Sequence, residues 1–571
     1  MKILFLTHAF NGLAQRLFIE LRDLGHEVAI ELDVNDALTA QALALARPDL
    51  VIAPFLKRAI PESVWSAVPC LVVHPGVPGD RGPSALDWAI LEGEREWGVT
   101  VLQAVGEMDA GPVWAHRAFP MRLAPKSSLY RREVTEAAVA AVTEAVDAFA
   151  RGGKPVAAGE LGAAARGRAR PLVRQADRAI DWAADDTLAV LRKIHSADGF
   201  PGIRDEILGR PVRLFGAHAE GTLRGPVPGG IIATRHGGIL RATRDGAVWI
   251  SHLQAIAPEG GEPTLKLPAT EVLGDALAGV AEIAYAVDAP PHGETWRELR
   301  YEEHGDVGVL HFAFHNGALS PPQCRRLLAA LQVAKARPTK VLVLAGGEDF
   351  WSNGIHLNAI EATGRPADAS WESINAIDDV AREIITMTDR LTVSALAGNA
   401  GAGGVFLALA ADRVWLNRGV VLNPHYKGMG NLYGSEYWTY LLPRRVGEKR
   451  AREITERRLP MGSHEAVNLG LADARFGHDP HAFLAAAIKR AQAMANDPRH
   501  ADTVFAKRRQ RLVDETAKPL DKYREEELER MKLNFYGFDP SYHVARYHFV
   551  HKLPKARTPY YLASHRAGAR G

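Results

Sequence analysis

Cysteine is scarce in this sequence: there are two, Cys70 and Cys324, which lie far apart and have no companion in a CxxC arrangement. Such a chain has no disulfide framework, and a reducing compartment suits it best. The sequence also lacks any run of about 18 apolar residues, the length that a membrane-spanning helix needs. Its opening, MKILFLTHAF, has no basic segment and cleavage site of a secretory signal. We therefore expect a cytoplasmic protein with no membrane partner.

Excess charge of either sign is absent as well. The formal net charge is +2 over 571 residues, which indicates neither nucleic acid nor an anionic membrane as a partner. The 22 histidines show no HExxH or similar ligand spacing, so the sequence does not indicate a metal. A hydrophobic content of 47% describes an ordinary globular chain. Its length exceeds what one hydrophobic core supports and predicts three or four structural units, acting on small-molecule substrates.

Glycine is plentiful between residues 392 and 436. A buried-type strand there leads into Gly398, Gly401, Gly403 and Gly404 and then into an apolar helix. Glycines leave the backbone open to close approach, and free N–H groups at a helix start polarise a carbonyl or bind an anion. By itself the pattern fits a tight strand-to-helix turn equally well.

A second segment decides between these interpretations. Residues 341–357, VLVLAGGEDFWSNGIHL, form another apolar strand followed by a glycine-containing turn. Together the two segments resemble the enoyl-CoA hydratase/isomerase (crotonase) family, over roughly residues 300–480. The resemblance implies a ββα superhelix. It also implies that the backbone N–H groups of Asn353 and Gly403 form an oxyanion hole for the carbonyl of a coenzyme A (CoA) thioester.

The crotonase-like part departs from its family at the catalytic residues. Phe406, six positions before Asp412, stands where hydratases carry their first catalytic glutamate, and a phenyl ring neither gives nor takes a proton. Hydration of an enoyl-CoA is therefore not expected. Near the second glutamate position the chain has Tyr426 and, ten residues later, Glu436. We interpret these two as an acid/base pair. A core tyrosine with a satisfied hydroxyl and a helix-capping glutamate are the structural alternatives.

The N-terminal part predicts a doubly wound parallel sheet over the first 120 residues, typical of a Rossmann-like α/β domain. KILFLT, RPDLVIAPF and CLVVHPG are buried-type strands, and an amphipathic helix follows the first of them. In such sheets ligands bind beyond the carboxyl ends of the strands. His74 lies there, directly after CLVV.

The residues around His74 resemble the folate-dependent formyltransferases, including methionyl-tRNA formyltransferase. The matching residues occur in the family's order: His74-Pro75, Pro78, Arg81-Gly82 and Asp109-x-Gly111. The resemblance implies N10-formyltetrahydrofolate as substrate, tetrahydrofolate as product, and a part for Arg81 in binding them. It also implies that His74, oriented by Asp109, handles a proton as formyl leaves nitrogen N10.

One family residue is missing from this site. The asparagine two positions before His74 is Val72 here, and Asn11, in the first strand-to-helix loop, is the candidate replacement. Taken alone, His74 fits a strand-end histidine bonded to backbone. The ordered Arg81 and Asp109 favour the catalytic interpretation.

Two further stretches carry candidate ligands for CoA. A long helix is predicted over residues 125–153, with Ser127 or Ser128 as its N-cap and Arg131 in its first turn. Cations at a helix start oppose the dipole, so this arginine either points into solvent or holds a phosphate such as that of CoA. Near the C-terminus, Arg546 and its aromatic neighbours either grip an adenine and phosphates or belong to a solvated helix packed by its aromatic edge.

These patterns predict a division of the chain into four parts, all in the α/β class. Residues 1–170 form the formyltransferase-like, folate-binding domain. Residues 171–267 resemble the small β-barrel-like C-terminal subdomain of that family, notably at Ile180-Asp181-Trp182 and Pro201-Gly202. Residues 268–296 are a linker, and residues 297–571 are a crotonase-like CoA/thioester domain with a helical C-terminal extension.

Both halves together resemble the HypX (HoxX) hydrogenase-maturation proteins, most specifically in the run NPHYKGMGNLYGSEYWTYLLPRRVG. The resemblance implies that formyl moves from N10-formyltetrahydrofolate to CoA in the first half. Formyl-CoA is then split to carbon monoxide (CO) and CoA in the second half. The CO becomes a ligand of a [NiFe]-hydrogenase, through transient contact with other hydrogenase-maturation proteins.

For that reaction Tyr426 and Glu436 supply the two proton-handling groups, with Glu436 as base and Tyr426 as acid, or the reverse. His425 is the fallback if neither is needed. Two other functions stay open: hydrolysis or isomerisation of another acyl-CoA, and a non-catalytic folate- or CoA-binding scaffold. Two proton-transfer pairs favour an enzyme, because a scaffold needs none.

Overall fold

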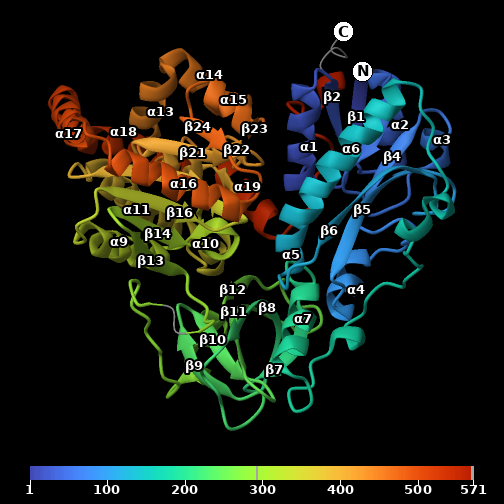
Figure 1. The fold of residues 1–571 in the computed structure, drawn as a ribbon, viewed down its shortest axis with the longest axis horizontal. Helices are drawn as coiled ribbons and strands as arrows, with labels where there is room; N and C mark the ends of the chain where they lie inside the picture. The colour runs from blue at the N-terminus through green and yellow to red at the C-terminus, as the bar shows by residue number, and fades with distance from the viewer. Residues whose placement is uncertain (291–292, 567–571) are drawn as a thin grey trace. The chain divides into compact units, whose positions relative to one another are not determined.

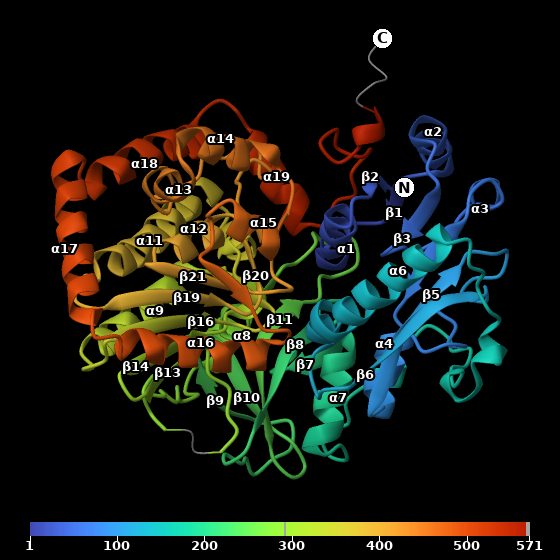
Figure 2. The same cartoon turned by 45° about the horizontal axis from the view of Figure 1, so that its top comes forward.

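The computed structural model describes residues 1–290 and 293–566, and these form two compact units (Figure 1; Figure 2). The described residues of the first unit are 1–282, 293–295 and 554–566, and those of the second are 283–290 and 296–553. The division expected from the sequence differs, since it assigned the whole of 297–571 to one domain. Residues 567–571 lie outside the described residues.

The segment 554–566 belongs to the first unit because it covers an open edge of that unit's sheet. The N–H of Ile30, on the edge strand, donates to the Leu562 carbonyl at 3.2 Å. The fully buried carboxylate of Glu31 contacts His565 Nε2 at 2.9 Å and accepts from Arg566 Nη2 at 2.9 Å. Edge backbone groups need partners, and so does a buried carboxylate. The tail supplies both.

The first sheet has the order β2-β1-β3-β4-β5-β6. Its strands are β1 (Lys2–Thr7), β2 (Glu27–Leu32), β3 (Leu50–Ala53), β4 (Cys70–His74), β5 (Glu96–Gln103) and β6 (Val113–Pro120). The first four pair in parallel, whereas β4–β5 and β5–β6 pair antiparallel. The expectation of a wholly parallel sheet was therefore wrong for β5 and β6. Their short connection, 104–112, has no helix for a parallel crossover, so the two strands form a hairpin.

Helices cover this sheet on both faces, as the doubly wound class requires. They are α1 (Gly12–Asp23), α2 (Asp36–Ala46), α3 (Glu62–Trp65), α4 (Ala85–Glu92), α5 (Lys126–Leu129) and α6 (Thr135–Ala150). The last two are joined by a π-helical turn, Tyr130–Val134. The predicted Rossmann-like formyltransferase class is confirmed.

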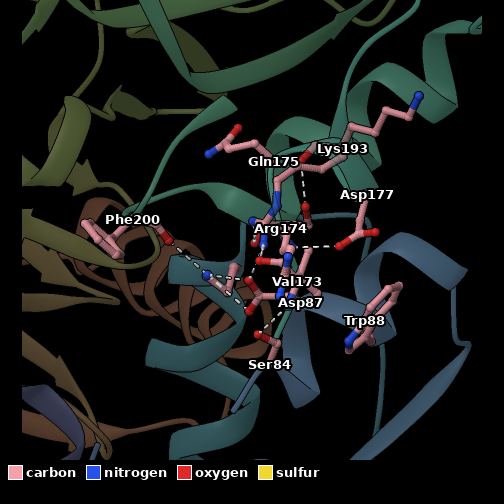
Figure 3. A network of polar contacts seen from close by, with 12 residues as sticks. Ser84, Asp87, Trp88, Val173, Arg174, Gln175, Asp177, Lys193 and Phe200 are labelled. Carbon is pink, nitrogen blue, oxygen red and sulfur yellow. Dashed lines mark hydrogen bonds and ion pairs between the residues drawn. The ribbon is translucent and has the colours of Figure 1, made fainter. Parts of the chain in front are cut away.

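A smaller antiparallel sheet follows in the same unit, in the order β7-β8-β11-β10-β9 with β12 beside β11. Its elements are α7 (Thr187–Ala197), β7 (Ile203–Ile207), β8 (Arg210–Glu220), β9 (Ile231–Arg235), β10 (Gly238–Ala242), β11 (Ala247–Ala255), β12 (Lys266–Pro268) and α8 (Ala269–Leu273). Buried Arg178 joins it to the first sheet: its Nη2 donates to Asp87 of α4 at 3.1 Å. Asp87 also accepts from Lys126 Nζ at 3.0 Å, and Lys126 donates to the Phe200 carbonyl (Figure 3).

The second unit is a spiral of strand–strand–helix repeats with two main sheets and a two-stranded one, formed by β15 (Ala318–Leu319) and β18 (Gly354–Ile355). The larger has the order β13-β14-β16-β19-β21-β24, and the smaller has the order β17-β20-β22-β23. The larger contains β13 (Leu299–His304), β14 (Val307–Phe312), β16 (Val341–Gly346), β19 (Leu391–Leu396), β21 (Arg413–Asn417) and β24 (Ala474–Phe476). The smaller contains β17 (Phe350–Ser352), β20 (Asn399–Gly401), β22 (Val421–Asn423) and β23 (Met461–Gly462). From β16 to β22 the strands of the chain alternate between these two sheets, apart from β18, which confirms the predicted ββα superhelix.

Helices pack on both sheets of this unit and continue into the C-terminal extension. Before the extension come α9 (Pro321–Lys335), α10 (Leu357–Ala362), α11 (Pro366–Thr386), α12 (Gly403–Leu409), α13 (Trp438–Val446), α14 (Glu448–Arg457) and α15 (Ser463–Asn468). The extension contains α16 (Pro480–Ala495), α17 (His500–Ala517), α18 (Leu520–Tyr536) and α19 (Ser541–Val550). Helix α18 buries Leu520, Met531 and Phe535 in the same core as α11 and α12. In the part of the chain that the structure describes, no helix combines the length and apolarity needed to span a membrane.

Candidate active sites

The first site centres on His74, which ends β4 at the carboxyl edge of the parallel strands. Its side chain is 5% exposed and lies between two carboxylates. His74 Nε2 is 2.9 Å from Asp80 Oδ1, and Nδ1 is 3.6 Å from Asp109 Oδ1. The predicted approach of His74 to Asp109 is therefore present, and a second carboxylate, Asp80, accompanies it.

Local backbone geometry holds these groups together. A side chain on Gly76 would overlap with His74 Nε2, so glycine at this position lets the imidazole lie where it does. Asp109 has a left-handed backbone, with φ of 55°, and its Oδ2 accepts from the N–H of Gly82 at 3.2 Å. That bond ties the Asp109 loop to the Arg81-Gly82 turn. The sequence motif therefore maps onto one compact arrangement.

Asp80 is the residue of this site that sequence analysis missed. It is 1% exposed, and its Oδ2 has no hydrogen-bond partner among the described residues. The nearest cation is Arg170, whose Nε lies 3.9 Å away. The available signal was a carboxylate in the loop between His74 and Arg81, where the formyltransferase motif is one residue longer.

The other candidates around this site have local partners. The Asn11 side-chain oxygen accepts from the N–H of Ala14 at 3.0 Å, as the N-cap of α1. Arg81 is 43% exposed at its side chain and donates from Nη1 to Glu107 at 2.6 Å. Val72, in place of the family asparagine, is a strand residue of β4.

The predicted N-cap for the helix near residue 126 was wrong. Helix α5 starts at Lys126 with Pro125 as its N-cap, so Ser128 lies inside the first turn. The Ser128 hydroxyl accepts from Arg122 Nη2 at 3.2 Å. Proline sets the backbone for a helix start, which explains the earlier beginning. Arg131 lies in the π-helical turn, a feature that occurs often at functional sites.

A cavity of about 620 Å³ opens at the carboxyl ends of β1, β2 and β3, where the strand order reverses. Its lining includes His8, Asp33, Lys57 and Arg58. Arg58 donates to Asp33 Oδ2 at 2.7 Å, so its charge is matched locally. Sequence analysis did not single out this cavity, although reversal points are the usual ligand sites of such sheets.

The second site lies between α12 and the loop before α13. The Tyr426 hydroxyl donates to Glu436 Oε2 and contacts the Ser435 carbonyl at 3.0 Å. Tyr426 is 7% exposed and Glu436 is 1% exposed. A side chain on Gly403 would overlap with the Glu436 carboxyl group, so this carboxyl lies directly over the first residue of α12. The predicted pair therefore sits together beside the glycine turn.

The two predicted oxyanion donors, the backbone N–H groups of Gly403 and Asn353, differ in whether they already have a carbonyl acceptor. Gly403 is the first residue of α12, so its N–H has no carbonyl acceptor within that helix. The Asn353 N–H instead donates to the Gly317 carbonyl at 2.7 Å. The expectation of two available donors is therefore not met here, because a nearby carbonyl pairs the Asn353 group, as buried backbone donors require.

Phe406, which the family resemblance places at the position of the hydratase glutamate, is fully buried. Its ring stacks on Tyr426, with centroids 5.0 Å apart and an interplanar angle of 16°. It thus holds the tyrosine ring in place and supplies no proton-transfer group. His425, one residue before Tyr426, has its pKa lowered to about 4 by burial and by the charge of Arg458.

Burial dominates the electrostatics of this pair. It raises the pKa of Glu436 to about 8, with the neighbouring Asp378 as the second cause. It also raises the pKa of Tyr426 well above its usual value, and the Glu436 charge adds to the effect. Both groups therefore hold their protons near neutral pH, and Glu436 becomes a base only as the pH approaches 8.

Arg546, the C-terminal candidate for CoA, is 3% exposed on α19. Its Nε donates to Glu361 Oε2 at 2.6 Å, and its guanidinium lies 5.1 Å from the Tyr542 ring centroid. The charge is matched by a carboxylate of the same unit. This arrangement favours the structural alternative for Arg546, a helix packed by its aromatic edge.

Known proteins resemble this chain both in its separate domains and over its whole length. Three family models match the chain: "Formyl transferase" over residues 23–146, "Formyl transferase, C-terminal domain" over 172–261 and "Enoyl-CoA hydratase/isomerase" over 307–551. The hydrogenase maturation factor HoxX of Bradyrhizobium diazoefficiens is 57% identical and covers 99% of this chain and 97% of its own. The chain belongs to the HypX/HoxX family of hydrogenase maturation factors.

A solved HypX structure shares the whole architecture. The crystal structure of HypX from Aquifex aeolicus in complex with tetrahydrofolic acid is 50% identical, with a TM-score of 0.95 over 99% of both chains. The methionyl-tRNA formyltransferase of Roseiflexus castenholzii is 28% identical over 43% of this chain and 77% of its own. The HypX/HoxX chain thus combines a formyltransferase half with a crotonase-like half, as the sequence predicted.

The matched regions coincide with the two sites of this HypX/HoxX chain. His74, Asp80 and Asp109 all lie within the formyl transferase match, whereas Tyr426 and Glu436 lie within the enoyl-CoA hydratase/isomerase match. Each half therefore carries its own group of titratable side chains, which are buried except for the half-buried Asp109.

Proposed function

We propose that this chain makes CO for the maturation of a [NiFe]-hydrogenase in two steps. His74, with Asp109, transfers formyl from N10-formyltetrahydrofolate to CoA. Tyr426 and Glu436 then split formyl-CoA to CO and CoA. The observation that carries the proposal is the buried Tyr426–Glu436 pair over Gly403, in a thioester-binding fold where Phe406 has replaced the hydratase glutamate.

In the first step the CoA thiol gives up its proton as its sulfur attacks the formyl carbon, and the C–N10 bond breaks as nitrogen N10 takes that proton. The products are formyl-CoA and tetrahydrofolate. A histidine that contacts two carboxylates is suited to carry that proton, because they fix its ring and balance its positive charge. The tetrahydrofolate bound to the Aquifex aeolicus relative supports folate as the substrate class.

In the second step Glu436 takes the proton from the formyl carbon. The C–S electron pair leaves with sulfur, CO departs, and Tyr426 protonates the thiolate. The Gly403 N–H is the donor for the thioester carbonyl. The direct hydrogen bond between Tyr426 and Glu436 then returns the proton to the tyrosine and resets the site. The raised pKa of Tyr426 fits a donor, although the reverse assignment uses the same two groups.

CoA binding in this proposal involves Arg131, whose π-helical turn lies at the start of the α6 region, and Ser128 beside it. Arg546 remains a candidate, but its ion pair with Glu361 would have to be shared with a phosphate. For the folate, Arg81 and Asn11 are the proposed contacts next to His74. Other hydrogenase-maturation proteins would receive the CO through transient contact.

The two alternative functions predict different behaviour. A hydrolase or isomerase of another acyl-CoA needs a base that activates water or moves a proton on a longer acyl chain, and Phe406 does not supply one. A non-catalytic scaffold has no need of a buried carboxyl held against a phenol. Activity on formyl-CoA compared with crotonyl-CoA separates the first alternative, and single-residue variants separate the second.

The decisive experiment supplies N10-formyltetrahydrofolate and CoA and follows CO by carboxy-haemoglobin absorbance. Tyr426→Phe keeps the stack on Phe406 but loses the hydroxyl, and Glu436→Gln keeps the volume but loses the base. Each should lower CO release by about 10² to 10⁴ and let formyl-CoA accumulate. His74→Ala or Asp109→Ala should instead stop the loss of formyl from the folate. CO release at the parent rate in both second-site variants would move the reaction elsewhere, with His425 next to be tested.

A further inference from the structure

Asp378 of α11 is a fully buried carboxylate next to the second site. Its Oδ1 accepts from the N–H of Glu436 at 2.8 Å and from the Ser435 hydroxyl at 2.6 Å, and its Oδ2 also accepts from that hydroxyl, at 2.7 Å. No other charged side chain among the described residues hydrogen-bonds to the Glu436 backbone. The Asp378 side chain is thus hydrogen-bonded to the backbone of Glu436, the proposed base.

The backbone at this point needs support. Glu436 and Tyr437 have φ of 59° and 58°, the left-handed region that residues other than glycine adopt at a cost of about 1–3 kcal/mol each. Asp378 anchors the first residue. Glu527 of α18 anchors the second, accepting from the N–H of Tyr437 at 3.0 Å and from the N–H of Thr439 at 2.9 Å. The left-handed pair directs the Glu436 side chain over Gly403.

The same contacts bring negative charges together in a buried place. After burial, the charge of Asp378 is the main cause that raises the pKa of Glu436, whereas burial raises the pKa of Asp378 only to about 6. Asp378 accepts hydrogen bonds from the Glu436 N–H and the Ser435 hydroxyl and lies 3.7 Å from Arg524 Nε, so it is the member of the pair that stays ionised. The other titratable groups packed around the pair are Cys324, Asp379, Tyr426, Tyr437, Arg524 and Glu527.

We propose that Asp378 is the positioning residue of the second site: it fixes the left-handed turn that aims Glu436 at Gly403. Its negative charge lies beside the carboxyl group that it positions. Asp378 thereby sets the pH range in which Glu436 acts as a base. This inference rests on the proposed role of Glu436 in CO release. It concerns a residue 58 positions earlier in the chain, on another helix.

The test is the pH profile of CO release from formyl-CoA by the full chain carrying Asp378→Asn. The amide keeps an oxygen to accept from Glu436 and Ser435 but removes the charge. The acidic limb of the profile should therefore move to lower pH by about one unit or more. A lower rate with an unmoved limb would overturn the proposal, because it would leave Asp378 a purely structural role.

Glu527→Gln is the matched control. It alters a second buried carboxyl that holds the same loop but makes no hydrogen bond to Glu436. The acidic limb of the pH profile of Glu527→Gln should lie at the same pH as that of the parent protein. Burial raises the pKa of Glu527 well above its usual value, so this carboxyl favours its uncharged form and Glu527→Gln disturbs the loop without removing a charge. A shift equal to that of Asp378→Asn would overturn the assignment to Asp378, because disturbing the loop alone would then move the limb.

A measurement on the parent protein tests the premise that Glu436 holds its proton near neutral pH, and it does not require Asp378→Asn to fold. The infrared carbonyl band of a protonated carboxyl group, assigned by its loss in Glu436→Gln, should disappear with a midpoint near pH 8. A Glu436 that is ionised throughout the range from about pH 5 upward, as a free glutamate is, would overturn the proposal. This titration does not depend on turnover, so a chain that releases no CO would refute the proposed function and leave the inference about Asp378 to be judged separately.

Discussion

Gly76 is the position where one added methyl group should disable the first site. A Cβ on this residue would overlap with His74 Nε2 and lie 2.7 Å from Asp80 Oδ1. Those two side chains are already in contact at 2.9 Å, so no space exists between them. The φ of Gly76 lies outside the left-handed region, so Gly76→Ala introduces a steric conflict without backbone strain.

The expected loss of stability in Gly76→Ala is the sum of two contributions. Separating His74 from Asp80 removes a hydrogen bond to a charged group, worth about 1.5–3 kcal/mol. Extra volume in a packed site costs about 1–3 kcal/mol. If the site stays rigid, the free energy of unfolding should fall by roughly 2.5–6 kcal/mol. If the imidazole turns away instead, the loss of stability is smaller, but formyl transfer should fall by about 10² or more because the proton carrier is misplaced.

The assay follows loss of formyl from N10-formyltetrahydrofolate in the presence of CoA, together with urea unfolding. Gly106→Ala is the matched control, since a Cβ there meets nothing within 4 Å. The control should behave as the parent in both measurements. Parent-like turnover and stability in Gly76→Ala would refute the close approach of His74 and Asp80 on which the reasoning depends.

Three further predictions concern other parts of the chain. Crotonyl-CoA should not be hydrated within about a hundredfold of the rate of the folate reaction, because Phe406 replaces the acid/base; loss of enoyl thioester absorbance measures this. Gly403→Ala should stop CO release but not formyl loss from folate, since its methyl overlaps with the Glu436 carboxyl; CO at the parent rate would contradict that placement. Glu31→Gln should lower the free energy of unfolding in urea by about 3 kcal/mol at neutral pH. Burial opposes ionisation of Glu31, but hydrogen bonds from the 554–566 segment outweigh it and lower its pKa. Ionised Glu31 therefore stabilises the fold at pH values above the pKa of an unfolded glutamate, about 4.3. This stabilisation is lost in acid, where the free energies of unfolding of parent and variant should converge.

The sequence was sufficient for the fold class and for those candidate residues of each site that belong to spaced motifs. His74 and Asp109 come from one ordered signature, and Gly403 and Phe406 come from counting along another. Tyr426 and Glu436 were found because they are the ionisable groups that follow the glycine turn. In each case the informative residues are close in the chain or belong to a recognisable pattern.

Residues that act through three-dimensional contact were not accessible in this way. Asp378 and Glu527 come from α11 and α18, and nothing in their local sequence marks them as neighbours of Glu436. Asp80 lies within the motif, but its contact with His74 depends on the course of a shortened loop. The pairing of the Asn353 N–H with Gly317 likewise depends on a turn from an earlier part of the chain.

The stacking of Phe406 on Tyr426 bears on the selectivity of the proposed reaction. A bound formyl thioester has two fates: it can lose CO, or water can attack the carbonyl and release formate. The second fate requires a base that holds a water molecule beside the carbonyl, and a buried phenyl ring offers water no hydrogen bond. An apolar surface at this place therefore favours deprotonation of the formyl carbon over hydrolysis. Phe406, whose side chain cannot support hydratase chemistry, would in this way also set how much formyl thioester goes to CO and how much to formate.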